Sequence, residues 1–370
     1  MGMSLTAVDA FSGGGGLTVG LKRAGFRVVA AIELEHHAFA IYKANHPEVR
    51  GLKQDITTVS GATLLRDAKV AQIDLLAGCP PCQGFTSLTA KYKDKEDQRN
   101  ELVLEIARLA EEMLPRAIMM ENVPGLTKKG ASLYRQLRDR LESIGYLLTE
   151  GILQVANFGV PQYRRRLVLL GGLSFRIPLP NATHSRSPTE NLVRWQTVRD
   201  TIADMSDPVS LRQARANGSV EESDWHVVRN LSSKNIERLR AARAGATWPH
   251  IPEELRPSCH RGGYSGFTNV YGRMEWDRPA PTITGGCTTF SKGRFGHPDA
   301  DRTISVREAA LLQTFPRDYR LDTPYMDHAC TVIGNALPCD FAEAISNQCA
   351  EHLRRHSRLA FRYNGNGVER

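Results

Sequence analysis

Strand-like and helix-like segments alternate along residues 5–173, and this alternation limits the possible folds more than any other feature. The strand-like segments are short, apolar and rich in branched residues; they comprise residues 5–11, 26–34, 73–79, 116–123 and 165–173. The segments between them repeat their apolar positions at spacings of three and four, which is the period of a helix. This order predicts an α/β fold with a doubly wound, mostly parallel sheet.

The alternation stops near residue 173, where a polar stretch rich in proline begins. The charged region that follows contains several tryptophans but little clear period. A chain of 370 residues is long enough for two domains. We therefore expect a larger Rossmann-like domain formed by residues 1–172 and 325–370, and a second, smaller domain formed by residues 173–324.

The net charge of +8 and the pI near 9.2 favour a polyanionic partner such as nucleic acid. No apolar run approaches the length of a membrane span, and the N-terminus lacks the pattern of a secretory signal. We therefore expect a cytoplasmic protein whose seven cysteines are reduced thiols.

The segment "VDAFSGGGGLTVG" predicts a strand, a glycine turn and the start of a helix, an arrangement that lets a ligand approach the backbone. Gly13 and Gly15 are followed by Thr18 where a dinucleotide-binding turn would have its third glycine. A different adenosine ligand stays possible. Glu33 follows the second predicted strand, where it could accept hydrogen bonds from ribose hydroxyls, and Asp55 could accept one from an adenine amino group.

The stretch "GCPPCQGFT" contains Cys79 and Cys82, a spacing that could indicate a metal site, a redox pair or a nucleophile. A zinc site needs a second close pair of ligands, and the other cysteines form none, so we expect no metal. Two prolines and a long polar loop also differ from the helix start that a thioredoxin-like pair favours. We expect Cys79 to be a buried apolar residue and Cys82, beyond the strand end, to be the reactive thiol.

Five segments in this order resemble the motifs of the cytosine carbon-5 DNA methyltransferases; they read "DAFSGGGGLTVGLKRAGF", "GCPPCQGFT", "ENVPGL", "VPQYRRRLV" and "VIGNALP". The resemblance implies that Cys82 attacks carbon 6 of cytosine and that Glu121 assists at ring nitrogen 3. It also implies that S-adenosylmethionine is the methyl donor. The chemistry adds roles for Arg166, which could donate to the cytosine carbonyl oxygen, and for Arg164, which could hold phosphate or brace Glu121. Asn122 is expected to brace its turn.

The same resemblance assigns the cofactor site. Phe11 would stack on the adenine, Asp55 and Ile56 would meet its edge, and Leu102 would pack against it. Glu33 would hold the ribose, and Asn335 would lie near the methionine carboxylate. The glycine turn with Gly13 and Gly15 would lie under this ligand.

Residues 173–265 lie where this family has its target recognition domain, so the partner we expect is double-stranded DNA. The target base would be flipped out of the duplex, and residues 83–100 would form a loop that closes over it. We expect a monomeric, bacterial or phage-like enzyme, bound to the nucleoid in a prokaryote, which can have a cognate restriction endonuclease as partner. Two alternatives stay open: a transfer-RNA cytosine-5 methyltransferase on the same fold, and a DNA-binding module without catalytic activity.

Overall fold

The computed structural model describes residues 4–81, 98–216, 218, 224–263 and 266–365. Cys82 and most of the expected closing loop lie outside these residues. The chain divides into two compact units. The first comprises residues 1–154, 165–181 and 339–370, and the second comprises residues 155–164 and 182–338.

These boundaries differ from the expected ones because the chain crosses between the units more often than its periodicity indicates. Residues 155–164 belong to the second unit, where Arg164 donates to the carbonyl oxygen of Ala336. Residues 173–181 stay with the first unit, because Ser174 and Arg176 donate hydrogen bonds to the backbone near the last strand pair.

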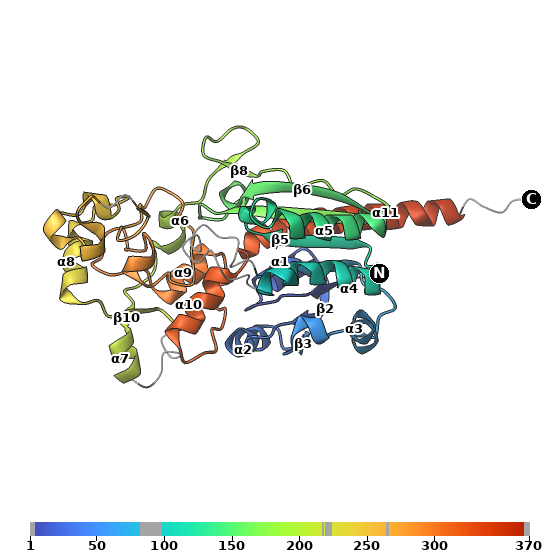
Figure 1. Cartoon of the computed structure of the whole chain (residues 1–370), viewed down its shortest axis with the longest axis horizontal. Helices are drawn as coiled ribbons and strands as arrows, with labels where there is room; N and C mark the ends of the chain where they lie inside the picture. Colours follow the sequence, from blue (N-terminus) through green and yellow to red (C-terminus); the bar gives the residue numbers. More distant parts are fainter. Residues whose placement is uncertain (1–3, 82–97, 217, 219–223, 264–265, 366–370) are drawn as a thin grey trace, which may run out of the picture. The chain divides into compact units, whose positions relative to one another are not determined.

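The first unit contains a seven-stranded sheet in the order β3-β2-β1-β4-β5-β7-β6. Figure 1 labels four of these strands, β2, β3, β5 and β6. Its strands are β1 (Thr6–Asp9), β2 (Arg27–Ile32), β3 (Arg50–Leu52), β4 (Leu75–Gly78), β5 (Ala117–Asn122), β6 (Tyr146–Gln154) and β7 (Arg165–Leu173). The strands β1 to β5 pair in parallel, and β7 runs antiparallel to both β5 and β6. The predicted doubly wound, mostly parallel sheet is therefore confirmed.

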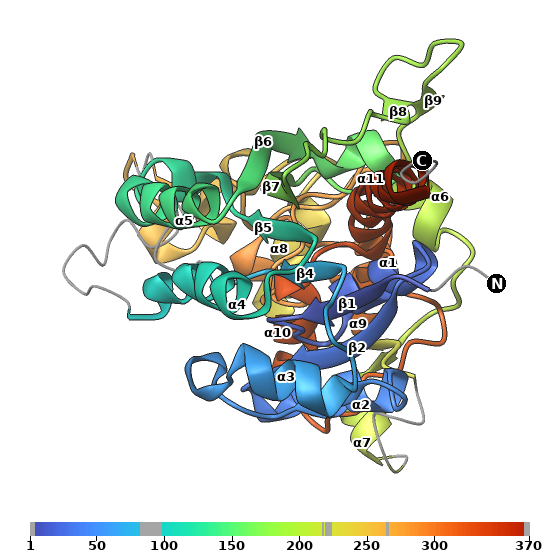
Figure 2. The ribbon, with the colours of Figure 1, turned by 90° about the vertical axis from the view of Figure 1, so that its right-hand side faces the viewer.

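Helices cover both faces of this sheet, as Figure 2 shows, with α3, α4 and α5 on one face and α1 and α11 on the other. The helical elements of this unit are α1 (Gly16–Arg23), α2 (His36–Asn45), η1 (Ile56–Thr58), α3 (Gly61–Ala68), η4 (Gln98–Leu104), α4 (Glu105–Met113), η5 (Pro124–Thr127), α5 (Ala131–Ser143) and α11 (Cys339–Gly365). Gly20 lets α1 and α11 pack closely, because a Cβ atom there would lie 2.5 Å from the Cβ atom of Ala342. The last segment of the chain is thus built into the first unit.

Strand order determines where a ligand can bind to this sheet. From β1 the chain adds β2 and β3 on one side, and then returns to add β4 and β5 on the other. In open α/β sheets, ligands bind beyond the carboxyl ends of the strands at such a reversal. The segments after β1 and β4 meet at this place, and they contain the glycine turn and Cys79.

The second unit contains short elements and a small apolar centre. Its elements are η6 (Val155–Phe158), β8 (His184–Ser185), β9 (Val193–Arg194), α6 (Val198–Ile202), β10 (Val209–Ser210), α7 (Leu211–Ala216), β11 (Val227–Val228), α8 (Ser233–Ala241), η7 (Trp248–His250), η8 (Glu253–Leu255), η9 (Ser258–His260), η10 (Phe290–Lys292), α9 (Val306–Leu312) and α10 (Met326–Asn335). Trp248, Ile251 and Phe290 are buried in this centre, and Trp225 is buried where its indole donates to the carbonyl of Leu321. None of the helices in the described part of the chain combines the length and apolar composition that a membrane crossing needs.

Candidate active site

Glu121, at the end of β5, is held by Arg166 on the neighbouring strand β7. Oε1 of Glu121 lies 2.6 Å from Nε of Arg166, and both side chains are largely buried, with exposed fractions of 8% and 12%. Arg166 also donates through Nη1 to its neighbour's carbonyl at Arg165, while its Nη2 has no hydrogen-bond partner among the described residues. The sheet therefore presents an oriented carboxylate with a guanidinium group beside it.

The turn after β4 approaches this pair. Asn122 donates to the carbonyl of Pro80 over 3.1 Å and accepts from the amide of Val123, so the prediction that Asn122 braces the turn is confirmed. Cys79 makes a hydrogen bond to Glu121; burial raises the pKa of this thiol well above its usual range, and the nearby carboxylates add to the effect. Cys79 is therefore a protonated partner of Glu121, and it is half-buried, which corrects the expectation of a buried apolar residue.

Arg164 donates to backbone carbonyls of the second unit, and its two expected roles, holding phosphate or bracing Glu121, stay predictions. Its buried guanidinium group donates to the carbonyl oxygens of Ile283, Gly334 and Ala336, at 2.8, 3.2 and 3.2 Å. These hydrogen bonds satisfy carbonyl groups of two separate segments, so they favour a structural role for Arg164. Sequence spacing could not distinguish the contacts of Arg164 from those of Arg166. These contacts depend on the path of the backbone at the start of β7.

Glu33 holds the glycine turn at the carboxyl end of β1. Its Oε2 accepts from the amide of Gly13 at 2.9 Å, and its Oε1 accepts from the amide of Glu35 at 2.7 Å. Burial raises the pKa of Glu33, although these backbone amides oppose the shift. Gly13 and Gly15 both have positive φ angles, 52° and 98°, in the left-handed region that favours glycine.

Asp9 is a functional candidate that the sequence reasoning did not single out, although it stands in the quoted glycine segment. It is fully buried, and its Oδ2 accepts from the Thr18 hydroxyl at 2.8 Å. That hydroxyl lies 3.0 Å from the Tyr42 hydroxyl. The other oxygen, Oδ1, is buried without a hydrogen-bond partner among the described residues. Burial raises the pKa of Asp9 to about 7, and the Glu33 carboxylate contributes to the shift.

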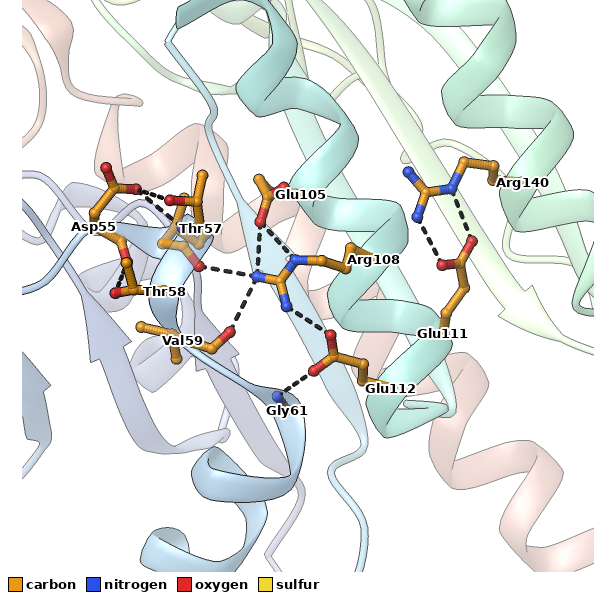
Figure 3. A network of polar contacts seen from close by, with 11 residues as sticks. Asp55, Thr57, Thr58, Val59, Gly61, Glu105, Arg108, Glu111, Glu112 and Arg140 are labelled. Atoms are coloured by element: carbon orange, nitrogen blue, oxygen red, sulfur yellow. Dashed lines mark hydrogen bonds and ion pairs between the residues drawn. The ribbon is translucent and has the colours of Figure 1, made fainter.

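Asp55 and Ile56 lie in the turn that follows β3. Figure 3 shows Asp55 beside Thr57 and Thr58. Oδ1 of Asp55 accepts from both the amide and the hydroxyl of Thr57, at 3.0 and 2.8 Å, while Oδ2 has no hydrogen-bond partner among the described residues. Ile56 is buried, and the partly buried Phe11 and Leu102 pack against the same apolar core. Three of the expected cofactor residues, Phe11, Ile56 and Leu102, thus share one core of the first unit. Asp55 directly precedes Ile56, and Glu33 holds the glycine turn.

Asn335 is exposed at the end of α10 in the second unit. Cys82, the expected nucleophile, lies outside the described residues, directly after Pro81. The expected roles of these two residues stay predictions.

A family model described as "C-5 cytosine-specific DNA methylase" matches residues 5–351. The chain belongs to this family. The relative M.HgiDII, a Type II methylase of Herpetosiphon aurantiacus, is 37% identical over 94% of this chain and 95% of its own length. The Type II methyltransferase M1.HphI of Haemophilus parahaemolyticus is 33% identical, over 93% of this chain and 86% of its own length. The family resemblance of the five sequence motifs is thereby confirmed.

Solved structures agree on the fold of this methyltransferase. A DNA modification methyltransferase encoded within an E. coli prophage matches with a TM-score of 0.69 at 23% identity, covering 95% of this chain and all of that chain. The S. pombe methyltransferase Dnmt2 matches with a TM-score of 0.62 at 20% identity and 95% coverage of this chain. These likenesses show a shared architecture.

Methyltransferases of this family and fold use S-adenosylmethionine, and the residues at the carboxyl end of the sheet fit that cofactor. S-adenosylmethionine carries positive charge at its sulfonium and ammonium groups. The site offers a fully buried carboxylate, Asp9, whose Oδ1 has no hydrogen-bond partner among the described residues, and a half-buried carboxylate, Glu33. Buried acids whose pKa values are raised by desolvation gain stabilisation from a neighbouring cation. The charge of the site therefore suits a cationic adenosine ligand.

Proposed function

We propose that this chain methylates carbon 5 of a cytosine within a specific double-stranded DNA sequence, with Cys82 as the nucleophile. The observation that carries the proposal is the Glu121–Arg166 pair, a buried and oriented carboxylate on the strand next to the cysteine turn. A cytosine placed beyond these strand ends needs such an acid. Carbon 5 is a weak nucleophile until a thiolate has added to carbon 6 and the added electron density is accommodated at nitrogen 3.

Cys82, Glu121 and Arg166 then have distinct tasks. The Cys82 thiolate forms a bond to carbon 6, Glu121 shares a proton with nitrogen 3, and the electron pair of the former double bond becomes available at carbon 5. Arg166 keeps Glu121 in place through Nε and can donate through Nη2 to the cytosine carbonyl oxygen. When bound, S-adenosylmethionine supplies the methyl group. Loss of the carbon 5 proton to a base and departure of the Cys82 sulfur then restore the aromatic ring.

The cofactor would be held by the residues around the glycine turn. We assign the adenine to Phe11, Ile56 and Leu102, with Oδ2 of Asp55 accepting from its amino group. Glu33 would take the ribose hydroxyls while holding Gly13, the glycine turn with Gly15 would lie beneath the ligand, and Asn335 would meet the methionine carboxylate. Support for these assignments comes from the family's motifs and, for the first unit, from the common core of these side chains.

The relatives named above are Type II enzymes, and we extend that description to this chain as part of the proposal. The enzyme would act as a monomer on chromosomal DNA in the cytoplasm, bound to the nucleoid, beside a restriction endonuclease of the same specificity. The recognition domain would be built from the second unit. Sedimentation of the purified protein at several concentrations tests the monomer, and a concentration-dependent dimer would contradict it.

A covalent trap tests the nucleophile. Duplex DNA with 5-fluorocytosine at the target should become attached to the protein when S-adenosylmethionine is present, because fluorine cannot leave carbon 5 as a proton does. Cys82→Ser should abolish both the adduct and turnover, since a hydroxyl is a far weaker nucleophile than a thiolate. Cys79→Ser is the matched control and should retain the adduct.

Peptide mass spectrometry then locates the attachment. An adduct at Cys79, or turnover that survives in Cys82→Ser, would overturn the assignment. Bisulfite sequencing of DNA from cells that express the protein identifies the target sequence in the same study. A transfer-RNA transcript serves as a competing substrate, and preferential methylation of the RNA would contradict DNA as the substrate.

A further inference from the structure

Arg108, on α4, fastens the turn after β3 to the body of the first unit (Figure 3). Its Nη2 donates to two backbone carbonyls of that turn, Ile56 at 2.9 Å and Val59 at 3.0 Å. Both of these residues are buried, so their carbonyl groups have little access to water. A single guanidinium group thus fixes both ends of a short segment.

Two acidic side chains of the same helix set the direction of that guanidinium group. Glu105 accepts from Nε of Arg108 at 2.7 Å, and Glu112 accepts from Nη1 at 2.6 Å. Glu112 also accepts from the amide of Gly61 at 2.6 Å, so it holds the residue where α3 begins. The carboxylates, the guanidinium group and the turn form one connected network, in which Nε, Nη1 and Nη2 of Arg108 all donate hydrogen bonds.

The fastened turn contains two of the residues proposed to recognise adenine, Asp55 and Ile56. Asp55 precedes Ile56 directly, and its Oδ1 is already occupied by Thr57, which leaves Oδ2 for a ligand. The direction of Oδ2 is set by the backbone conformation of Asp55 and Ile56. Arg108 holds that conformation through its hydrogen bonds to the carbonyls of Ile56 and Val59. Misplacing a hydrogen-bond acceptor lowers affinity even when the residue itself is intact.

We propose that Arg108 is a positioning residue for the cofactor, which it serves by holding the Asp55–Ile56 backbone where the adenine edge binds. This inference rests on the adenine role proposed for Asp55 and Ile56. Arg108 does not itself touch the cofactor in this proposal. Its effect should therefore be confined to cofactor affinity and should leave the chemistry and the DNA site unchanged.

The test compares Arg108→Lys with Arg140→Lys in the full-length protein. A lysine at position 108 keeps the charge but cannot reach two carbonyls and two carboxylates together. We expect the Kd and KM for S-adenosylmethionine to rise about tenfold, while kcat and the KM for DNA stay within about twofold. Arg140 is the matched control because it binds Glu111 of the same helix through two hydrogen bonds, at 2.8 and 2.6 Å, and these contacts lie outside the turn. Arg140→Lys should leave the KM for the cofactor unchanged.

Glu112→Gln provides a second variant in case Arg108→Lys does not fold. It weakens the contacts to Arg108 and Gly61 and should raise the KM for the cofactor about threefold. An Arg108→Lys protein that folds and binds the cofactor as tightly as wild type would overturn the inference. So would an equal rise of the cofactor KM in Arg140→Lys, since the effect would then follow from any lost ion pair on α4.

A double variant separates this inference from the proposed function. Asp55→Ala alone should weaken cofactor binding, and adding Arg108→Lys should weaken it by less than the product of the two separate effects. If Asp55→Ala binds normally, the adenine role of Asp55 is wrong, and the inference fails with it. If Asp55→Ala weakens binding and the two effects multiply independently, the adenine role stands and the positioning role of Arg108 is overturned.

Discussion

At the scale of single residues, Asp9 and Glu33 show how burial sets the charge of the cofactor site. Asp9 is fully buried and Glu33 is half-buried, and the charge of Glu33 contributes to raising the pKa of Asp9. The hydrogen bond from Thr18 favours ionised Asp9 but does not outweigh desolvation. Without a cation nearby, Asp9 therefore exchanges its proton near neutral pH.

This charge balance predicts that cofactor binding releases a proton. The pKa of Asp9 is about 7 before binding, and a cationic ligand lowers it by favouring the carboxylate. At pH 7, about half a proton per molecule should therefore be released. Calorimetric titration with S-adenosylmethionine in two buffers of different ionisation enthalpy measures that number, and Asp9→Asn should remove the release. Identical heats in the two buffers for the wild type would contradict the prediction.

Sequence reasoning indicated positions in this region but not the contacts of their side chains. Glu33 follows β2 and Asp55 follows β3, and both accept from backbone amides that the sequence does not specify. Arg164 and Arg166 are two positions apart on the chain, yet Arg166 pairs with Glu121 while Arg164 donates to the carbonyl oxygens of Ile283, Gly334 and Ala336. Such choices depend on the direction of a turn, which the sequence pattern does not fix.

At the scale of elements, residues at the end of α2 make hydrogen bonds to the glycine turn and to the helix that follows it. Tyr42 and His46 lie one helical turn apart, with ring centroids 4.9 Å apart. The Tyr42 hydroxyl reaches Thr18 on α1, and the His46 ring makes a hydrogen bond to the backbone at Gly15. His46 also lies 3.1 Å from the ammonium group of Lys22, an arrangement that suits a neutral imidazole accepting at Nδ1.

His46 should make stability depend on pH. Burial, followed by the charges of Lys22 and Lys43, lowers the pKa of His46 to about 4, although Glu48 opposes them. The unfolded chain therefore binds the proton more readily, so the free energy of unfolding should fall as pH drops from about 6.5 to about 4. The loss from this residue is at most about 3 kcal/mol. Urea unfolding across this window should show a shallower fall for His46→Gln than for wild type. Equal slopes would mean that His46 does not contribute.

The elements themselves differ in how well the sequence indicates them. The five predicted strands match β1, β2, β4, β5 and β7 because most of their residues are buried and apolar. The short edge strand β3 and the long edge strand β6 were not predicted. In β6, buried and partly exposed residues are mixed, so its composition resembles a loop. Its place in the sheet depends on pairing with β7, a contact that local periodicity does not reveal.

At the scale of the whole molecule, the basic composition is less available to DNA than the net charge indicates. Several arginines of the second unit serve the protein itself: Arg273 donates to three carbonyls and to Asp301, and Arg238, Arg256 and Arg261 each donate to carbonyl oxygens. The sequence alone could not separate these from DNA-binding residues, because both kinds are scattered. A smaller set is exposed and has no hydrogen-bond partner for its guanidinium group among the described residues: Arg186, Arg212, Arg215 and Arg243.

The difference between paired and unpaired arginines predicts which replacements change the salt dependence of DNA affinity. Each arginine that contacts a DNA phosphate contributes about 0.9 to the slope of log affinity against log salt, because a condensed counterion is released. Replacing Arg243 with alanine should lower the slope by about that amount if it contacts phosphate, and Arg186, Arg212 and Arg215 are to be tested in the same way. Arg199→Ala is the matched control: this arginine is also exposed, but it is paired with Asp277 through two contacts, at 2.7 and 3.2 Å. Its replacement should leave the slope unchanged.

Fluorescence anisotropy with labelled duplex between 50 and 300 mM salt, about the range in which such slopes are read, measures all five variants. Unchanged slopes in all four test variants, together with a lower slope in Arg199→Ala, would show that paired rather than unpaired arginines face the DNA.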